Sequence, residues 1–126
     1  MKPKRPVLVV DDSPFVRRVL SRRLAECGLG VREAASVAEG IAVPAGEVAC
    51  AVLDLELGDG HGVALALALR AADAALPIAF FSGGAEADVL ALARAIGPLF
   101  SKTEDPDAVV AWAVEAARVR GAKRAR

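Results

Sequence analysis

The 126-residue chain is 55% hydrophobic but only 4% aromatic, and its 16 basic residues balance 16 acidic ones. This length suits one domain with a substantial core, and no apolar run approaches the roughly 20 residues of a membrane-spanning helix. Eight basic residues lie in 1–5 and 118–126, so the body between them has a net charge of −8, which argues against nucleic acid as its partner. The chain opens without a secretory pattern, and Cys27 and Cys50 lack metal or disulfide spacing, so we expect a cytoplasmic protein.

Short apolar runs and amphipathic stretches alternate along the chain. Strands are expected at 7–10, 31–35, 48–53, 78–81 and 99–101. Helices are expected at 14–27, between Ser36 and Pro44, at 63–72, at 86–96 and from Asp105 onward, with Ser13 and Ser36 as N-caps. This fivefold β-α repeat predicts an α/β fold, a flavodoxin-like, doubly wound (βα)5 three-layer sandwich with a parallel five-stranded sheet. By analogy with such folds, we expect the strand order 2-1-3-4-5.

The domain is expected to occupy residues 6–119. A basic N-terminal extension (1–5) precedes it, and a basic C-terminal tail (120–126) follows it. The last nine residues contain no acid and carry Arg118, Arg120, Lys123, Arg124 and Arg126. We interpret this end as solvated and frayed rather than as a binding site. The alternative is that it begins a linker in a larger protein.

The stretch from Cys50 to Gly62 carries the first functional signal. Four apolar or small residues run into Asp54, and a loop with three glycines follows (CAVLDLELGDGHG). Ligands of open parallel sheets bind beyond the carboxyl ends of the strands, so an acid at this position lies where chemistry occurs. Polar residues follow three other expected strands: Asp11 and Asp12 the first, Ser82 the fourth and Lys102 the fifth. In the order 2-1-3-4-5 these strands are neighbours, and their polar groups converge on one edge.

Three carboxylates at one edge repel one another and need compensating cations. Lys102 supplies one positive charge, and a divalent cation would supply two. Mg²⁺ fits because it prefers oxygen ligands and is bound by one or two carboxylates together with phosphate. Asp54 could then act as a nucleophile that forms an aspartyl phosphate. Lys102 and the cation would balance the charge on the phosphoryl oxygens, Ser82 would donate to one of them, and Gly83 leaves its backbone N–H open.

The chain resembles the receiver domains of two-component response regulators over essentially its whole length. The matching stretches are VLVVDDSPFVRRVL, VLDLELGDGHG, PIAFFSGG and FSK. The resemblance implies that Asp54 is the phosphoacceptor, that Asp12 and Asp54 bind Mg²⁺, and that Asp11 holds a water of the metal. It also implies a third metal contact from the backbone carbonyl of Glu56, a Ser82 hydroxyl that moves toward the phosphoryl group, and a phosphate-binding role for Lys102.

On this basis we expect a stand-alone signalling domain that is not an enzyme and catalyses only its own phosphorylation and dephosphorylation. The expected phosphoryl donor is a histidine kinase or a histidine phosphotransfer protein. A downstream protein is expected to bind the face formed by the fourth helix, fifth strand and fifth helix (86–120). We expect no direct contact with nucleic acid or membrane, and a monomer or weak dimer. Phe15, with Arg17 and Arg18, is a candidate docking site for the donor protein.

Several positions depart from the family pattern. In the loop after the acceptor, Gly58 and His61 stand where Pro and Asp are frequent, and Thr103 follows Lys102 where Pro is usual. Leu99 stands where a switch aromatic is expected, with Phe100 displaced by one position. These departures question the switching mechanism and the loop after the fifth strand, but they remove no group that phosphorylation needs.

Simpler interpretations stand beside these roles. Asp11 and Asp12 could favour a helix start, Lys102 could be an ion-paired strand end, Ser82 could serve only its turn, and His61 could be a solvated loop residue. For the whole chain, the alternatives are a phosphorylation-independent interaction module, a receiver fragment of a larger regulator, and a small Mg²⁺-dependent phosphatase with Glu56 as second acid. The short loop and the lack of a cap argue against the phosphatase.

Overall fold

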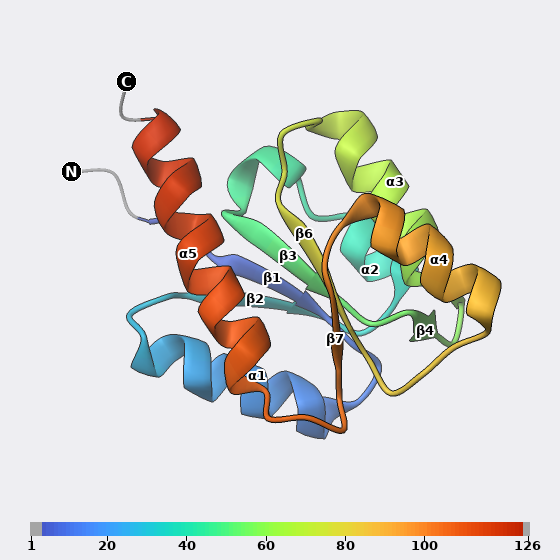
Figure 1. Ribbon diagram of the computed structural model, residues 1–126. Coiled ribbons are helices and arrows are strands. Elements are labelled where there is room, and N and C mark those ends of the chain that lie inside the picture. Colours follow the sequence, from blue (N-terminus) through green and yellow to red (C-terminus); the bar gives the residue numbers. More distant parts are fainter. Residues whose placement is uncertain (1–3, 125–126) are drawn as a thin grey trace.

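The computed structural model describes residues 4–124 as a twisted sheet between two layers of helices (Figure 1). The strands are β1 (Val7–Val10), β2 (Val31–Ala34), β3 (Cys50–Leu53), β4 (Glu56–Leu57), β5 (Gly60–His61), β6 (Ile78–Ser82) and β7 (Leu99–Ser101). The helices are α1 (Pro14–Glu26), α2 (Val37–Ile41), α3 (Gly62–Ala72), α4 (Ala87–Ile96) and α5 (Asp107–Arg124), with a 3-10 turn η1 (Ala45–Glu47). No helix within this described range is both long and apolar enough to cross a bilayer.

Five strands form one parallel sheet in the order β2-β1-β3-β6-β7. Counted without the short β4 and β5, this is the order 2-1-3-4-5, and the prediction of a doubly wound α/β fold is confirmed. Val7 of β1 lies opposite Val31 of β2 and Cys50 of β3, so β1 is enclosed on both sides. Parallel strands covered on both faces are apolar throughout, which explains why β1, β3 and β6 are fully buried.

Two separate cores hold the sheet from its two faces. Successive strand residues point to opposite faces, so Leu8 and Val10 pack in the core beneath α2, α3 and α4, and Val7 and Val9 pack in the core beneath α1 and α5. Figure 1 shows these two helical layers on opposite sides of the strands. Because both faces are packed, the carboxyl ends of the strands are fixed relative to one another.

The predicted N-caps of the first two helices form. Ser13 Oγ accepts a hydrogen bond from the Val16 N–H at 3.3 Å, and Ser36 Oγ accepts one from the Glu39 N–H at 3.1 Å. The Glu39 carboxylate in turn accepts from the Ala35 N–H at 3.3 Å. The two bonds accepted by the serines satisfy N–H groups that the first turn of a helix leaves without partners. They explain why both helices begin where the sequence predicts.

The loop after β3 differs from its prediction. The sequence predicts a plain glycine-rich loop, whereas the structure contains a small antiparallel hairpin in which Glu56 pairs with His61 and Leu57 with Gly60. Gly58 at the turn has a φ of 40°, a left-handed conformation that glycine adopts without a steric penalty. Leu57 is buried in the core beneath α2 and α3, and it anchors the hairpin there.

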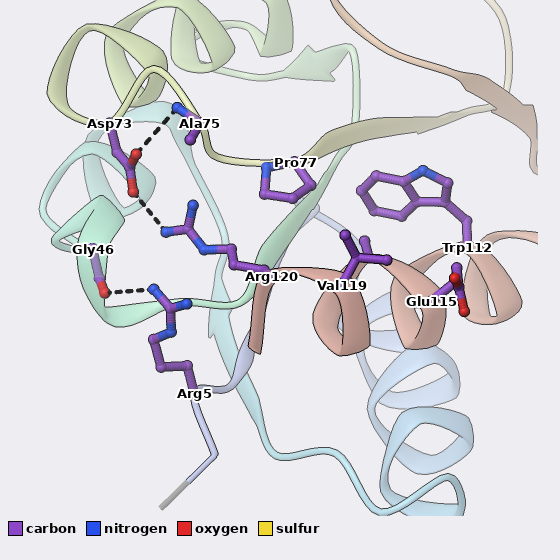
Figure 2. A pocket seen from close by; sticks show the side chains of 10 residues that line it. Arg5, Gly46, Asp73, Ala75, Pro77, Trp112, Glu115, Val119 and Arg120 are labelled. Atoms are coloured by element: carbon purple, nitrogen blue, oxygen red, sulfur yellow. Dashed lines mark hydrogen bonds and ion pairs between the residues drawn. The ribbon is translucent and has the colours of Figure 1, made fainter. Parts of the chain in front are cut away.

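The expectation of a solvated, frayed basic end is wrong for Arg120, which is buried in α5, whereas Arg118 lies in the same helix and stays exposed. Arg120 is only 9% exposed. Its Nη2 donates to Asp73 Oδ2 at 2.6 Å (Figure 2) and to the Ala45 carbonyl at 3.4 Å. The hydrogen bond from Arg120 holds the pKa of Asp73 below its usual range. Arg118 donates two hydrogen bonds to the Glu115 carboxylate.

The remaining basic residues of the two ends are placed only in part. Lys123 and Arg124 lie in α5, while Arg126 and residues 1–3 lie outside the described residues. Arg5 donates from Nη1 to the Gly46 carbonyl at 3.1 Å, so it too contacts the domain (Figure 2). The boundaries at 6 and 119 remain predictions.

Candidate functional site

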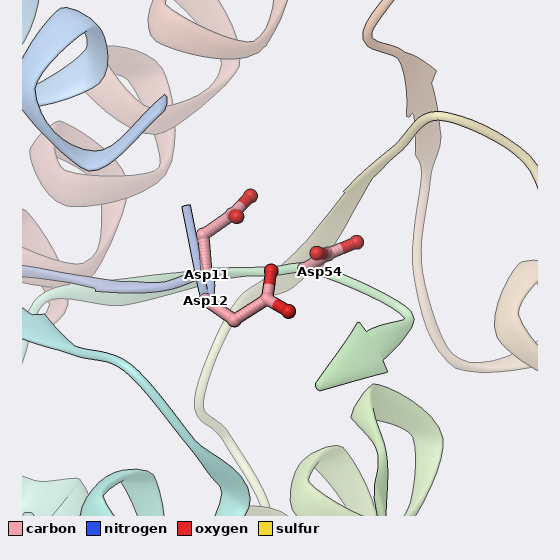
Figure 3. Close-up of side chains that lie close together, drawn as sticks. All are labelled: Asp11, Asp12 and Asp54. Carbon is pink, nitrogen blue, oxygen red and sulfur yellow. The ribbon is translucent and has the colours of Figure 1, made fainter. Parts of the chain in front are cut away.

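Four strand ends bring polar side chains to one edge of the sheet. Asp11 and Asp12 follow β1, Asp54 follows β3, Ser82 ends β6 and Lys102 follows β7. Asp11, Asp12 and Asp54 each offer a carboxylate oxygen, and these oxygens lie within 4.8 Å of one another (Figure 3). Asp11 and Asp54 are buried, whereas Asp12 is exposed. The structure thus gathers the three carboxylates that the sequence assigns to a metal site.

Lys102 lies between the two buried carboxylates. Its Nζ is 2.8 Å from Asp11 Oδ2 and 3.1 Å from Asp54 Oδ2. Its backbone N–H donates to the Ser82 carbonyl at 2.8 Å, which continues the pairing of β6 and β7. One ammonium faces three carboxylates, so the cluster carries an excess of two negative charges when all groups are ionised. A divalent cation would neutralise that excess.

The protonation of Asp54 reflects its burial and its neighbours. Burial, followed by the charge of Asp11, raises the pKa of Asp54, and the opposing effects of Lys102 and the Glu56 N–H do not cancel this rise. Burial by itself would lower the pKa of Lys102, but its hydrogen bond to Asp11 and the charges of both carboxylates outweigh burial and raise it. Lys102 therefore stays cationic, and added positive charge at the site would favour the ionised form of Asp54.

Backbone contacts fix the acids that follow β1. Asp11 Oδ1 accepts a hydrogen bond from the N–H of Ser13, the N-cap of α1, at 2.9 Å, in addition to its contact with Lys102. Arg17 Nη1 donates to the Asp11 carbonyl at 2.7 Å, and its Nε contacts Glu33 Oε1 at 3.2 Å. Only 18% of the Arg17 side chain is exposed. Arg17 thus holds the backbone of Asp11, a role that its sequence position does not indicate, and of the two arginines suggested for docking only Arg18 is exposed.

The start of α3 packs directly on the backbone of the candidate acceptor. Gly62 is buried, and its N–H donates to the Leu55 carbonyl at 2.9 Å. A Cβ at Gly62 would lie 1.9 Å from the backbone oxygen of Asp54, so only glycine fits this position. The Glu56 N–H approaches Asp54 Oδ1 at 3.5 Å. The role of the Glu56 carbonyl as a metal contact remains a prediction.

The Ser82 hydroxyl is occupied within its own turn. It accepts from the Gly84 N–H at 3.1 Å and donates to the Gly84 carbonyl at 3.3 Å. This is the simpler interpretation of Ser82, and a phosphate-binding role requires the hydroxyl to turn away from Gly84. Gly83 is exposed, and a Cβ at this position would meet only Lys102 Cδ, at 3.9 Å. The Gly83 position therefore leaves open space beside Lys102.

The residues that depart from the family pattern have defined places. Leu99 packs against the core beneath α3 and α4, whereas Phe100 packs against the core beneath α1 and α5. Because they face opposite sides of the sheet, Phe100 does not substitute for an aromatic at position 99. The Thr103 N–H donates to Ser101 Oγ at 3.1 Å, and this contact shapes the loop after β7. His61 is exposed, and its Nδ1 lies 3.6 Å from Glu56 Oε2.

A doubly wound sheet with three carboxylates and a lysine at its carboxyl edge defines the class of this protein: an α/β domain with an acidic site at its strand ends. A family model for the response regulator receiver domain matches residues 7–112. The chain belongs to the response regulator receiver domain family, as the sequence motifs indicate, and it is a signalling domain of the two-component kind.

A curated relative agrees with this assignment. The chain is 42% identical over 69 residues to the acid tolerance regulatory protein ActR of Sinorhizobium medicae (strain WSM419), an alignment that covers 54% of this chain and 36% of ActR. The chain therefore matches only about a third of that relative's length. The rest of ActR lies outside this alignment.

Solved structures share the fold. A CheY-like response regulator receiver domain protein from Methanospirillum hungatei JF-1 has a TM-score of 0.84 at 20% identity, covering 96% of this chain and 99% of that one. A response regulator protein from Burkholderia pseudomallei, solved with a phosphorylated aspartic acid, a calcium ion and citrate, has a TM-score of 0.75 at 24% identity, covering 94% and 72%. At these identities the likeness shows the fold alone.

Proposed function

We propose that the chain is a phosphorylation-activated receiver, in which Asp54 accepts a phosphoryl group from a phosphohistidine in the presence of Mg²⁺. The observation that carries this proposal is the contact of Lys102 with both Asp11 and Asp54 beside a third carboxylate. Family membership supports it, and so does the phosphorylated aspartic acid of the Burkholderia pseudomallei regulator with the same fold.

The donor set fits Mg²⁺. Asp11, Asp12 and Asp54 offer only carboxylate oxygens, which are the ligands this ion prefers, and the exposed Asp12 leaves room for metal-bound water. In the proposed site Asp12 and Asp54 would hold the ion, Asp11 would hold one of its waters, and the Glu56 carbonyl would add a further contact. When bound, Mg²⁺ supplies positive charge against the phosphoryl oxygens.

The transfer step uses the chain's own groups. A carboxylate oxygen of Asp54 forms a bond to phosphorus while the P–N bond of the donor phosphohistidine breaks, and the electron pair of that bond returns to the imidazole nitrogen. In this proposal Lys102 Nζ, which lies 3.1 Å from Asp54 Oδ2, contacts the incoming phosphoryl oxygens. Ser82 contributes by releasing Gly84 and donating to the same group. The chain thereby catalyses its own phosphorylation and later hydrolysis, and no other substrate is expected.

The proposed partners use different faces. Phe15 is 70% exposed and borders a pocket next to the acidic edge, which is also lined by Val16, Val19, Phe81, Lys102 and Pro106. A histidine kinase or phosphotransfer protein is proposed to dock here, with the exposed Arg18 of the same helix contributing to the contact. The downstream protein is proposed to bind the face of α4, β7 and α5. The cytoplasmic location expected from the sequence remains part of this proposal.

The experiment is intact-mass spectrometry after incubation with acetyl phosphate and Mg²⁺. We expect one phosphoryl adduct, which is lost in Asp54→Asn and when EDTA replaces Mg²⁺. An adduct that persists in Asp54→Asn would contradict the proposed acceptor. An adduct that is independent of divalent cations would contradict the metal site.

A phosphorylation-independent interaction module is the second candidate. It is favoured by the Ser82 hydroxyl, which is bound at both of its hydrogen-bonding functions by Gly84, and by Leu99 in place of an aromatic. Beryllofluoride, a phosphoryl mimic, separates the two candidates. A receiver should bind it with Mg²⁺ and shift the amide NMR signals of Ser82 to Gly84, whereas a folded chain without such shifts would favour the module.

A further inference from the structure

The carboxylate of Asp59 joins the hairpin after β3 to the start of α2. Asp59 Oδ1 accepts a hydrogen bond from the Val37 N–H at 2.9 Å, and Oδ2 accepts one from the Ala38 N–H at 3.1 Å. These two N–H groups belong to the first turn of α2, where no helical carbonyl is available to them. Asp59 therefore satisfies two such donors at once, from 21 and 22 residues away in the sequence.

The same contact is supported by packing. A Cβ at Gly60 would lie 3.3 Å from Val37 Cγ2, so the hairpin turn rests closely on the first residue of α2. The two hydrogen bonds lower the pKa of Asp59, which keeps it ionised and makes both bonds charge-assisted. Ser36 caps α2 separately through the Glu39 N–H. The helix start thus has two independent caps, of which only one comes from the hairpin.

The hairpin connects this cap to the acidic edge. Its first strand begins at Glu56, two residues after Asp54, and the Glu56 N–H approaches Asp54 Oδ1 at 3.5 Å. The path from α2 to the acceptor therefore runs through Asp59, across the β4-β5 pairing and into the backbone of Glu56. Asp59 is thus connected to the acidic edge through the backbone of the hairpin.

We propose that Asp59 is a positioning residue for the metal site. Asp59 clamps the hairpin to α2, and this hairpin carries the Glu56 carbonyl that is proposed to contact the metal. This inference rests on the proposed function for its metal, but the clamp itself does not depend on a metal. Asp59 does not contact the reacting atoms, and it acts by limiting the positions that the backbone of Glu56 can take.

Two variants separate the clamp from simple helix capping. Asp59→Ala removes the contact between hairpin and helix, and Ser36→Ala removes the other cap of α2 without touching the hairpin. Amide hydrogen exchange is measured by NMR in both variants without metal. We expect faster exchange of the hairpin amides 56–61 in Asp59→Ala only, while the α2 amides exchange faster in both. Unchanged hairpin exchange in Asp59→Ala would overturn the clamp.

Mg²⁺ titration, followed through amide chemical shifts, tests the positioning role. Groups that orient metal ligands change metal affinity by about 10–100-fold, and we expect a change near the lower limit, about tenfold weaker binding, in Asp59→Ala. Asp59→Asn keeps one acceptor oxygen, so its Mg²⁺ affinity should lie between those of Asp59→Ala and the wild type. Ser36→Ala should bind Mg²⁺ like the wild type. Equal Mg²⁺ affinities in the Ser36 and Asp59 variants would overturn the positioning role.

The hydrogen-exchange measurement and the Mg²⁺ titration also separate this inference from the proposed function. If the wild-type chain binds no Mg²⁺, the proposed function fails, and with it the positioning of a metal site, while the exchange measurement still decides whether the clamp exists. If the wild type binds Mg²⁺ and Asp59→Ala binds it equally well, the proposed function survives and the positioning role does not.

Discussion

Replacement of Gly62 by alanine tests how closely the start of α3 packs on the candidate acceptor. The added Cβ would lie 1.9 Å from the backbone oxygen of Asp54 and 3.2 Å from the Cα of Leu55. A Cβ essentially never lies closer than 3.0 Å to another heavy atom, so the oxygen contact is strongly repulsive and the two atoms must move apart by at least about 1 Å. Both contacts are with backbone atoms, which cannot turn aside as a flexible side chain can.

The expected cost follows from two opposing effects. Overpacking of a well-packed site costs about 1–3 kcal/mol, and a clash with backbone belongs at the upper end of that range. Alanine is favoured over glycine within a helix by at most about 1 kcal/mol, so the net loss of unfolding free energy should be about 2 kcal/mol. Gly83→Ala is the matched control, because its Cβ would meet only Lys102 Cδ at 3.9 Å. Its effect should stay within about 0.5 kcal/mol.

Urea unfolding of the two variants and the wild type measures these differences. Gly83→Ala should not lose stability. Because the Asp54 backbone moves in Gly62→Ala, the folded fraction of this variant should also incorporate phosphate from acetyl phosphate more slowly. A Gly62→Ala variant as stable as Gly83→Ala would refute the close packing of α3 on the acceptor backbone.

Three further predictions concern separate parts of the domain. Asp73→Asn removes the carboxylate bound by Arg120 and should lower the free energy of unfolding by about 1 kcal/mol. A hydrogen bond to a charged group contributes about 1.5–3 kcal/mol, and the partial exposure of Asp73 reduces this contribution. Because the pKa of Asp73 is lowered on folding, this advantage of the wild type is complete at neutral pH and is lost as the pH falls through that lowered pKa. A thiol reagent should label Cys27 in the native protein but not Cys50, whose pKa burial raises to about 12, and urea should expose the second thiol. Phe15→Ala should leave phosphorylation by acetyl phosphate unchanged and slow transfer from a phosphohistidine protein.

Each of these has a result that would contradict it. A stability difference for Asp73→Asn that stays constant from neutral to acidic pH would show that the ion pair is not its source. Labelling of both thiols in the native state would contradict the burial of Cys50. Equal rates with the protein donor for Phe15→Ala and the wild type would remove Phe15 from the docking surface.

The sheet and the acidic edge were predictable because their signals are local. The runs at β1, β3 and β6 are apolar and short, and the capping residues Ser13 and Ser36 stand directly before their helices. The acids and Lys102 follow the strands immediately, so the strand order alone brings them together. The order itself came from analogy with doubly wound folds, since the sequence contains no direct record of which strands are neighbours.

The features that escaped prediction depend on partners distant in sequence. Arg120 looks like part of a basic tail until α5 places it against Asp73, 47 residues earlier. Asp59 lies in a glycine-rich loop and gains its role only because the fold brings the start of α2 to it. The orientation of the Ser82 hydroxyl toward Gly84 is equally a property of the folded turn. Such contacts leave no periodic or spacing signal in the sequence.

The central claim is that Asp54 is the phosphoacceptor, and chemical location of the phosphoryl group tests it most directly. After incubation with acetyl phosphate and Mg²⁺, sodium borohydride reduces an aspartyl phosphate to homoserine, and peptide mass spectrometry identifies the converted position. We predict homoserine at position 54 alone, and none when Mg²⁺ is replaced by EDTA. Homoserine at Asp11 or Asp12, or none anywhere in a folded chain that also fails to bind beryllofluoride, would contradict the claim.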